Sequence, residues 1–252
     1  MSVAGNVFDF SDEGVANFQP EKPKLNFLQT SFQEFQDTHN IDPFFYDFAG
    51  ELLTPYRALY EQGPWIAGGF LTRSLQKENQ HNFGGDVDIW FSEPEHIGEY
   101  MHDLESGRFG LNATKDKNFS SQYSFSYMVT FRGKEYKIQL ISYRTFDCIE
   151  NLLRKFDLFS AMIATDGVNI FYEKDKSLNC AKNKILSYNW DHVNGSTSNP
   201  DARLVLKRYS KFIANGYSVT DREIELFARL IKELSVFTNN LQENYDAVLK
   251  DN

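Results

Sequence analysis

The six residues DVDIWF, which begin at Asp86, constrain the fold more than any other stretch of this chain. They alternate, and successive side chains of a β-strand point to opposite faces of the sheet. Val87, Ile89 and Phe91 are therefore predicted to enter a hydrophobic core. Asp86 and Asp88 then share the other face, about 7 Å apart along the strand, where two carboxylates repel and raise each other's pKa.

A divalent cation would relieve the repulsion between Asp86 and Asp88. Mg²⁺ prefers oxygen ligands, needs only one or two carboxylates, and fills its remaining positions with water and substrate phosphates. The pair is therefore predicted to bind Mg²⁺, with Mn²⁺ as an alternative ion. Because Asp-x-Asp is a short pattern, the residues alone also fit an exposed strand that carries two solvated acids.

A second pattern precedes this strand. The residues from Pro64 to Ala67 are apolar, as in a short buried strand; Gly68 and Gly69 follow, and the next residues suit the first turns of a helix. Glycine lets a backbone approach an anion, and a helix start presents free N–H groups and a positive dipole end. The glycines are therefore predicted to hold phosphates, assisted by Arg73. An ordinary tight turn is the alternative.

Taken together, Gly68, Gly69, Asp86 and Asp88 resemble the first motif of the nucleotidyltransferase superfamily, which includes DNA polymerase beta, poly(A) polymerases and CCA-adding enzymes. In that pattern a strand, a glycine pair and a helix precede a strand with Asp-x-Asp, and the connector here is somewhat longer. The resemblance implies an α+β fold: a palm with a mixed, antiparallel-rich sheet and helices on one side, then a helical domain. The motif order favours the CCA-adding and poly(A) polymerase side.

The expected organisation of the 252 residues is a loose tail over 1–23, a palm with N-terminal helices over 24–175, and a helical domain over 176–252. Apolar spacing predicts helices and alternation predicts strands. The predicted helices cover Leu25–Phe35, Phe44–Leu59 with a bend or end at Pro55, and Glu93–Ser106. A further helix within Asn199–Val219 is predicted to end at Asn215-Gly216, with five residues inward: Leu204, Leu206, Tyr209, Phe212 and Ile213. The last predicted helix opens with a capping box at Thr220, has Ile224 inward, and is expected to continue toward Leu241 and Val248. The remaining predicted strands cover 123–131, 135–142, 157–165 and 168–172, with helical packing as an alternative for 157–165.

The strand over 135–142 departs from the resembled superfamily. There it usually supplies a third carboxylate beside the Asp-x-Asp pair, and the best-placed residue here is Gln139. A neutral amide can hold one metal-bound water, but it cannot neutralise a second ion or act as a general base. Glu135 shares its face but lies about 13 Å away along the strand. Two interpretations follow: a transferase that uses one metal or substrate assistance, or a degenerate enzyme.

Two looser motifs extend the resemblance toward the C-terminus. Arg154, Lys155 and Asp157 partly match the first three residues of an Arg-Arg-Asp-Phe-Thr motif, although Phe156 is inserted before the aspartate. In the resembled enzymes that aspartate helps hold the ribose, which implies nucleotide contacts for Arg154 and Asp157. A later helix packs over the nucleotide in those enzymes, which implies the same role for Lys207 and Arg208. The alternatives are a backbone turn at Asp157 and a solvated basic helix face.

Composition narrows the function classes. The net charge of −9 argues against a broad polyanion-binding surface, although it leaves room for a local basic groove. Cys148 and Cys180 give neither a disulfide framework nor zinc spacing. No apolar run approaches the roughly 20 residues of a membrane span, and the N-terminus lacks the basic and apolar regions of a secretory signal. We therefore expect a cytoplasmic protein without a membrane partner.

These patterns favour an enzyme that moves a nucleoside monophosphate from a nucleoside triphosphate to an acceptor hydroxyl and releases pyrophosphate. The acceptor could be an RNA 3′ end, a protein side chain or a small molecule. The alternative is a catalytically degenerate binding or structural module on the same scaffold, which Gln139 and the acidic net charge favour. Retention of Asp86 and Asp88 ranks the enzyme first, and the residues do not indicate an oligomeric state.

Overall fold

The computed structural model describes residues 25–76, 85–108, 110, 112–116, 121, 123–189, 202–228 and 232. Three predicted features therefore lie outside the described residues. They are the tail over 1–23, most of the connector that follows Gln76, and the continuation of the last helix beyond 232.

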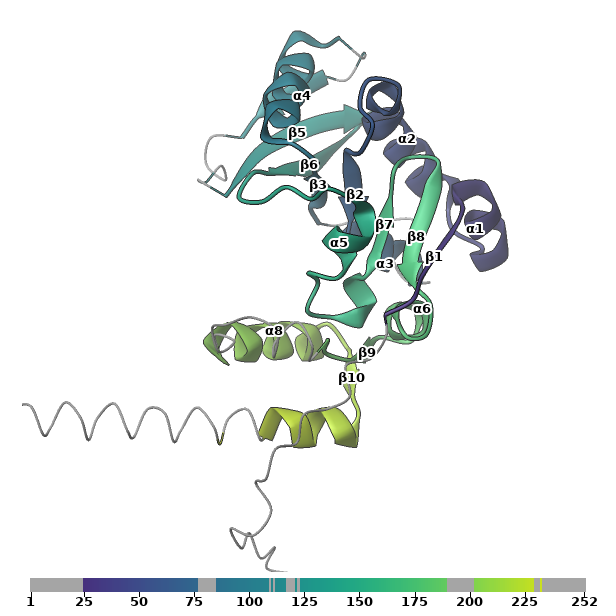
Figure 1. The fold of residues 1–252 in the computed structure, drawn as a ribbon, viewed down its shortest axis with the longest axis vertical. Coiled ribbons are helices and arrows are strands. Elements are labelled where there is room, and N and C mark those ends of the chain that lie inside the picture. Colours follow the sequence, from purple (N-terminus) through teal and green to yellow (C-terminus); the bar gives the residue numbers. More distant parts are fainter. Residues whose placement is uncertain are drawn as a thin grey trace, which may run out of the picture.

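A mixed, eight-stranded sheet forms the centre of the molecule (Figure 1). Its strand order is β1-β8-β7-β2-β3-β6-β5-β4, and every pair is antiparallel except β3 with β6. The predicted α+β class with a mixed, antiparallel-rich sheet is confirmed. The strands are β1 (Phe27–Ser31), β2 (Trp65–Ala67), β3 (Val87–Trp90), β4 (Asn112–Lys115), β5 (Ser124–Phe131), β6 (Lys134–Ile141), β7 (Ile163–Thr165) and β8 (Asn169–Glu173).

Most of the helices that pack on this sheet lie on one face, in line with the expected arrangement, and one short helix lies on the other. The alternation along the strands decides which core each residue joins. Ile66 in β2 and Ile89 in β3 face the larger core, under α1 (Phe32–His39), α2 (Pro43–Arg57), α3 (Gly69–Ser74) and α4 (Pro94–Ser106). Trp65 and Trp90 face the opposite way and join a smaller core under α5 (Ile149–Leu153). Asp86 and Asp88 alternate with the residues of the larger core, so they belong to the α5 side.

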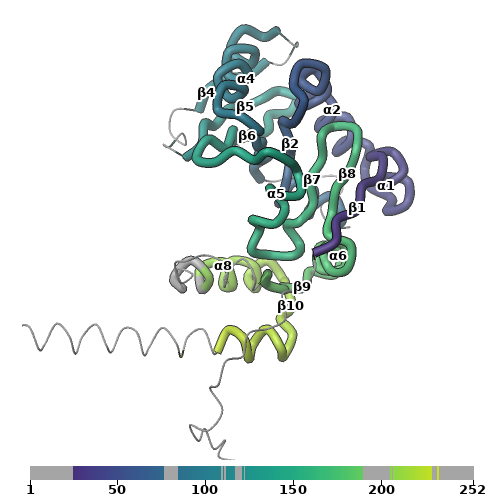
Figure 2. The backbone as a smooth tube through the Cα atoms, viewed as in Figure 1, coloured from purple at the N-terminus to yellow at the C-terminus, as the bar shows by residue number. Residues whose placement is uncertain are grey.

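The C-terminal elements form a third cluster, which lies below α5 in Figures 1 and 2. Val205 and Tyr209 of one helix pack against Leu158, which follows α5, and against Tyr188, which comes shortly before that helix. The elements of this part are the 3₁₀ helix η2 (Phe159–Ala161), α6 (Ser177–Lys182), β9 (Ile185–Leu186), α8 (Ala202–Ala214), β10 (Ser218–Val219) and a helix over 221–228. None of the helices in the described part of the chain is long and apolar enough to cross a membrane.

Three predicted elements differ from the structure. The helix predicted from Leu25 begins only at Phe32, because β1 pairs with β8 and this strand pairing overrides the apolar spacing. Pro55 lies inside α2, which ends two residues later at Arg57; close to its C-terminus the helix accommodates proline. The strand predicted from Asp157 is confined to Ile163–Thr165, since η2 takes up the preceding residues.

The predicted C-terminal helices form, but two of their predicted core residues do not face inward. Ile213 is 51% exposed and Ile224 is 53% exposed, so both predictions were wrong. Tyr209 is buried and Phe212 packs against the same cluster, as predicted, and Val205 joins them from α8. The capping box at Thr220 is confirmed in its first half, because the Glu223 amide donates to the Thr220 hydroxyl oxygen at 3.4 Å.

Candidate active site

The predicted glycine turn joins β2 to α3. Gly68 has φ +85° and ψ −132°, and a Cβ placed on it would lie 3.1 Å from a ring carbon of Phe156. The left-handed φ and the nearby ring both require glycine at this position. The Thr72 hydroxyl lies 3.1 Å from the Gly68 carbonyl oxygen and 2.6 Å from that of Ser160, which fixes the turn against η2.

The two acids lie where β3 begins, beside this turn. Val87 and Ile89 are fully buried on the opposite face, so Asp86 and Asp88 point toward the α5 side as predicted. Because β2 and β3 are antiparallel, with Ile66 opposite Ile89, the end of β2 and its glycine turn lie next to the acids. The two sequence motifs, Gly68-Gly69 and Asp86-x-Asp88, therefore lie next to each other in the fold.

Gln139 faces the acids from β6, as predicted. It is paired with Asp88 in the parallel β3–β6 register, and its Nε2 donates to Asp86 Oδ2 at 3.0 Å. Lys137, two residues earlier on the same face, places Nζ 3.6 Å from Asp86 Oδ1; its side chain is 20% exposed and that of Asp86 is 42% exposed. An amide donor and an ammonium group thus stand where the resembled enzymes usually have a third carboxylate.

Arg73 ties the glycine turn to the acid strand. Its Nη2 donates to the Asp86 carbonyl oxygen at 3.0 Å. A Cβ on Gly69 would lie 3.2 Å from Arg73 Nη1, and one on Gly85 would lie 2.8 Å from Nη2. Burial lowers the pKa of Arg73, while Asp88 and Asp86 act in the opposite direction. The guanidinium group is therefore packed between two glycine segments rather than extended into solvent.

Asp88 is the acid with the more unusual environment. Burial is the main cause that raises its pKa to about 6, and the charge of Asp86 adds to the effect. Arg73, Lys211 and Lys137 oppose the rise. Lys211 lies on α8, so this helix brings positive charge to the acids as well. Burial makes the ionised form of this carboxylate unfavourable, so a nearby cation would stabilise that form strongly.

Asp157, predicted to touch the ribose, lies in a second acid site. Its side chain is 13% exposed, forms an ion pair with Arg208, and accepts a hydrogen bond from the Tyr188 hydroxyl at 3.0 Å. The other two predicted nucleotide contacts lie elsewhere. Arg154 stacks over the Phe27 ring, with 5.0 Å from Cζ to the ring centroid, and Lys207 is exposed on α8.

Sequence reasoning missed Lys137, Lys211 and Tyr188 at these two sites. Lys137 carried a usable signal, because it alternates with Gln139 and must share its strand face. Lys211 belongs to the same basic helix as Lys207 and Arg208, but its approach to Asp88 had no local signal, and neither had Tyr188, because both depend on how the C-terminal segment packs against residues 157–161.

The side chains present fit one Mg²⁺ rather than two. In the described part of the chain no group of three or more His, Cys, Asp or Glu side chains gathers around a metal position. Asp86 and Asp88 still provide the one or two carboxylates that Mg²⁺ needs when water and substrate phosphates complete its shell. A second ion would lack an anionic ligand at Gln139, and Lys137 already compensates part of the charge of Asp86.

The sequence matches one protein-family model. The model described as "Gad2: Gabija anti-defense 2 family protein" matches residues 26–184, which include both acids and Gln139. The chain belongs to this family. The match spans the whole eight-stranded sheet and ends just before β9.

Two further comparisons add little. No curated protein matches the chain. Among solved structures, the Bacillus stearothermophilus CCA-adding enzyme in complex with CTP is 13% identical, with a TM-score of 0.43 over 71% of this chain. The chain covers 42% of that enzyme, and a likeness this distant does not assign an activity.

Proposed function

We propose that this member of the Gabija anti-defense 2 family is a magnesium-dependent nucleotidyltransferase. It would move a nucleoside monophosphate from a nucleoside triphosphate to an acceptor hydroxyl. The observation that carries the proposal is the contact between the glycine turn, Arg73 and the acid pair, in which Asp88 has a pKa raised to about 6. This arrangement unites a place for phosphates with carboxylates that a cation would stabilise.

Each residue has a role in this reaction. The backbone at Gly68 and Gly69 would receive the β- and γ-phosphates, and Arg73 would balance their charge. Asp86 and Asp88 would hold one Mg²⁺, which supplies charge neutralisation at the phosphates when it is bound. Lys137 lies beside Asp86 and would supply the positive charge that a second metal ion supplies in two-metal enzymes.

The chemistry is an in-line substitution at the α-phosphorus. The acceptor oxygen forms a new bond to phosphorus, the bond to the bridging oxygen of the β-phosphate breaks, and pyrophosphate leaves. The acceptor proton passes to solvent water, because Gln139 cannot accept it. Catalysis rests on positioning and on charge neutralisation rather than on a covalent intermediate.

The family description supplies a biological setting. It names Gabija anti-defense, and we propose that the transfer reaction is the means by which this chain opposes that defence.

A catalytically degenerate binding module is the second candidate. It is favoured by the way Gln139 and Lys137 occupy both oxygens of Asp86, which leaves this acid partly satisfied without any metal. On that interpretation, the acids and their partners form an interaction surface, and no nucleotide would be transferred.

One experiment separates the two candidates. Purified protein is incubated with each nucleoside triphosphate, labelled at the α-phosphate, with Mg²⁺ or Mn²⁺ and with total cellular RNA and protein. We expect label in one fraction with wild type and none with Asp88→Asn. Asp37→Asn, at an exposed position on α1, is the matched control and should transfer like wild type. No label with any nucleotide, or equal label with Asp88→Asn, would reject the transferase.

A further inference from the structure

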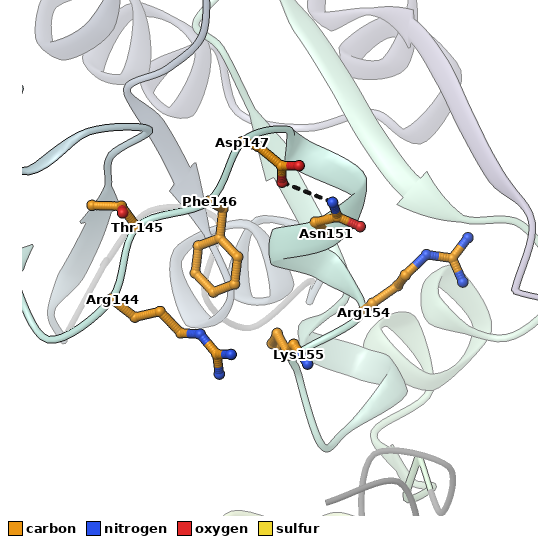
Figure 3. Close-up of a pocket in the computed structure, with 7 residues that line it drawn as sticks. All are labelled: Arg144, Thr145, Phe146, Asp147, Asn151, Arg154 and Lys155. Carbon is orange, nitrogen blue, oxygen red and sulfur yellow. Dashed lines mark hydrogen bonds between the residues drawn. The ribbon is translucent and has the colours of Figure 1, made fainter.

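An open cavity of about 470 Å³ lies at the loop between β6 and α5 (Figure 3). Three cationic side chains line it, and all three are exposed. A single carboxylate lines it as well, and that group accepts a hydrogen bond of 2.7 Å from a neighbouring amide. The cations are Arg144, Arg154 and Lys155; the carboxylate is Asp147 and its partner is Asn151.

The cations of this cavity have no carboxylate partner among the residues that the structure describes. Arg144 packs over Phe146, with 5.6 Å from Cζ to the ring centroid, and Arg154 packs over Phe27 at 5.0 Å. Figure 3 shows the Arg144 guanidinium extended toward Lys155. Stacking on a ring orients a guanidinium while its N–H groups stay free, and that fork matches phosphate oxygens.

Aromatic side chains connect the cavity to the acids. Phe146 packs edge-on against Trp90 with ring centroids 5.8 Å apart, and Trp90 lies two residues beyond Asp88 on the same strand face. Tyr143 also contacts Trp90, at 5.9 Å, and is 58% exposed. Partial burial raises the pKa of Tyr143, and the charges of Arg144, Arg208 and Asp88 also act on it. Tyr143 therefore lies between the cavity and the active site.

The same path carries a second exposed ring and two buried polar atoms without partners. Tyr123 is 57% exposed and lies edge-on to Tyr143, with ring centroids 6.3 Å apart. Trp90 Nε1 and Ser142 Oγ are buried and have no hydrogen-bond partner among the described residues. Buried polar atoms are normally paired, so these two atoms are exceptions within the ring cluster.

We propose that this cavity and the Tyr123–Tyr143 ring pair bind a single-stranded nucleic acid, whose end is the acceptor of the transfer reaction. The proposal rests on the function proposed above and names its acceptor class. Free cations beside exposed rings are the features that hold a single strand, through its phosphates and its unstacked bases. A duplex hides its base faces and would leave Tyr143 without a stacking partner. The acidic chain thus carries a local basic groove despite its net charge of −9.

Binding of labelled oligonucleotides tests the site directly. Fluorescein-labelled U₁₀, A₁₀ and dT₁₀, and a ten-base-pair duplex, are titrated at two salt concentrations with the full chain and no nucleoside triphosphate. We expect at least one single strand to bind more tightly than the duplex. Arg144→Ala/Lys155→Ala should weaken single-strand binding by about tenfold or more. It should also lower the salt slope by about 1.4, since each phosphate contact in a single strand contributes about 0.7.

Two controls separate this site from general charge and from mere misfolding. Lys134→Ala/Lys182→Ala removes the same charge at exposed positions in β6 and α6 and should bind like wild type. Tyr143→Ala should lose about five- to a hundredfold in affinity, whereas Tyr143→Phe should retain it, because stacking needs the ring alone. Failure of wild type to bind any single strand, or equal losses in the cavity and control variants, would overturn the proposal.

The catalytic proposal fails by a different outcome. Asp86→Asn/Asp88→Asn should still bind the oligonucleotide, since neither acid lines the cavity. Cavity-dependent binding without any nucleotide transfer would reject the transferase and keep the binding site. Transfer to protein or to a small molecule, without cavity-dependent oligonucleotide binding, would reject the site and keep the transferase.

Discussion

The two acid sites of this protein are built in opposite ways. Asp157 is enclosed by its partners, with Arg208 in an ion pair and the Tyr188 hydroxyl 3.0 Å away. Asp88 has its pKa raised to about 6 by burial and by a second acid, and the nearby cations only partly offset that rise. The protein's own side chains compensate the charge of Asp157, whereas the ionised form of Asp88 is only partly compensated.

This difference indicates what each site does. The ion pair between Asp157, which follows α5, and Arg208 on α8 holds these two parts of the chain together. A ligand that replaced either partner would lower the stability of the fold. An acid pair with a residual cost is stabilised when a cation arrives, and such perturbed groups concentrate at functional sites. Asp86 and Asp88 are therefore expected to control activity, and Asp157 to control stability.

The strongest way to break this comparison is to remove the acid pair. Asp88→Asn should lower nucleotide transfer by about a thousandfold or more, because the phosphates lose the charge neutralisation on which the proposed reaction depends. Its melting temperature without metal should equal or exceed that of wild type, since the repulsion with Asp86 is gone. Transfer assays and thermal melts measure the two effects. A strongly destabilised Asp88→Asn would make the acid structural.

The opposite result is expected at the second site. Asp157→Asn should lower the free energy of unfolding by about 1 to 3 kcal/mol, because it leaves Arg208 partly buried without its counter-ion. We place it below the cost of a fully buried pair, since the Arg208 side chain is 38% exposed. Urea denaturation measures the loss, with Asp175→Asn at an exposed position as the matched control. A stable variant that loses only nucleotide binding would restore the ribose role.

The palm was largely predictable from sequence because its signals are local and periodic. Alternation fixed the core face of β3, and Val87 and Ile89 are fully buried. The glycine pair and the β6 strand also fall where the pattern placed them, and Gln139 faces Asp88. These features depend on strand periodicity and on glycine turns, and both can be recognised in the sequence.

The rest depends on contacts between segments far apart in the chain. Leu28 has helical spacing with Phe32 but lies in β1, because β8 offers a partner strand. Ile213 is apolar and correctly spaced but exposed, whereas its neighbour Phe212 packs against the cluster of Val205 and Tyr209. The ion pair of Asp157 with Arg208 joins residues about fifty positions apart, and no local pattern announces such a pair.

A smaller change should sharpen the role of the amide beside the acids. Gln139→Glu replaces a donor to Asp86 with a third carboxylate, so it should lower stability without metal by about 1 to 2 kcal/mol. Mn²⁺ should then raise its melting temperature more than that of wild type, because an anionic oxygen ligand has been added. Gln33→Glu, on the exposed face of α1, controls for the added charge. The absence of any Mn²⁺ shift in both proteins would contradict a metal site.

The smallest expected effect is the pH dependence of Asp88. Its pKa in the folded protein, about 6, lies above the ordinary value of 3.8, so the folded state binds more protons than the unfolded state between these values. Stability from this group therefore falls as pH rises from about 4 to 6 and is regained on acidification.

Between pH 7 and pH 5 the gain should be about 1 kcal/mol. Other groups titrate in the same range, so the informative quantity is the stability difference between Asp88→Asn and wild type. Asparagine mimics the neutral acid at every pH; its advantage at pH 7 should therefore shrink by about 1 kcal/mol at pH 5. Asp37→Asn should show no such change, because that residue is exposed on α1. A pH-independent difference for Asp88→Asn would mean that Asp88 ionises as easily as a surface acid, and the contrast with Asp157 would lose its electrostatic basis.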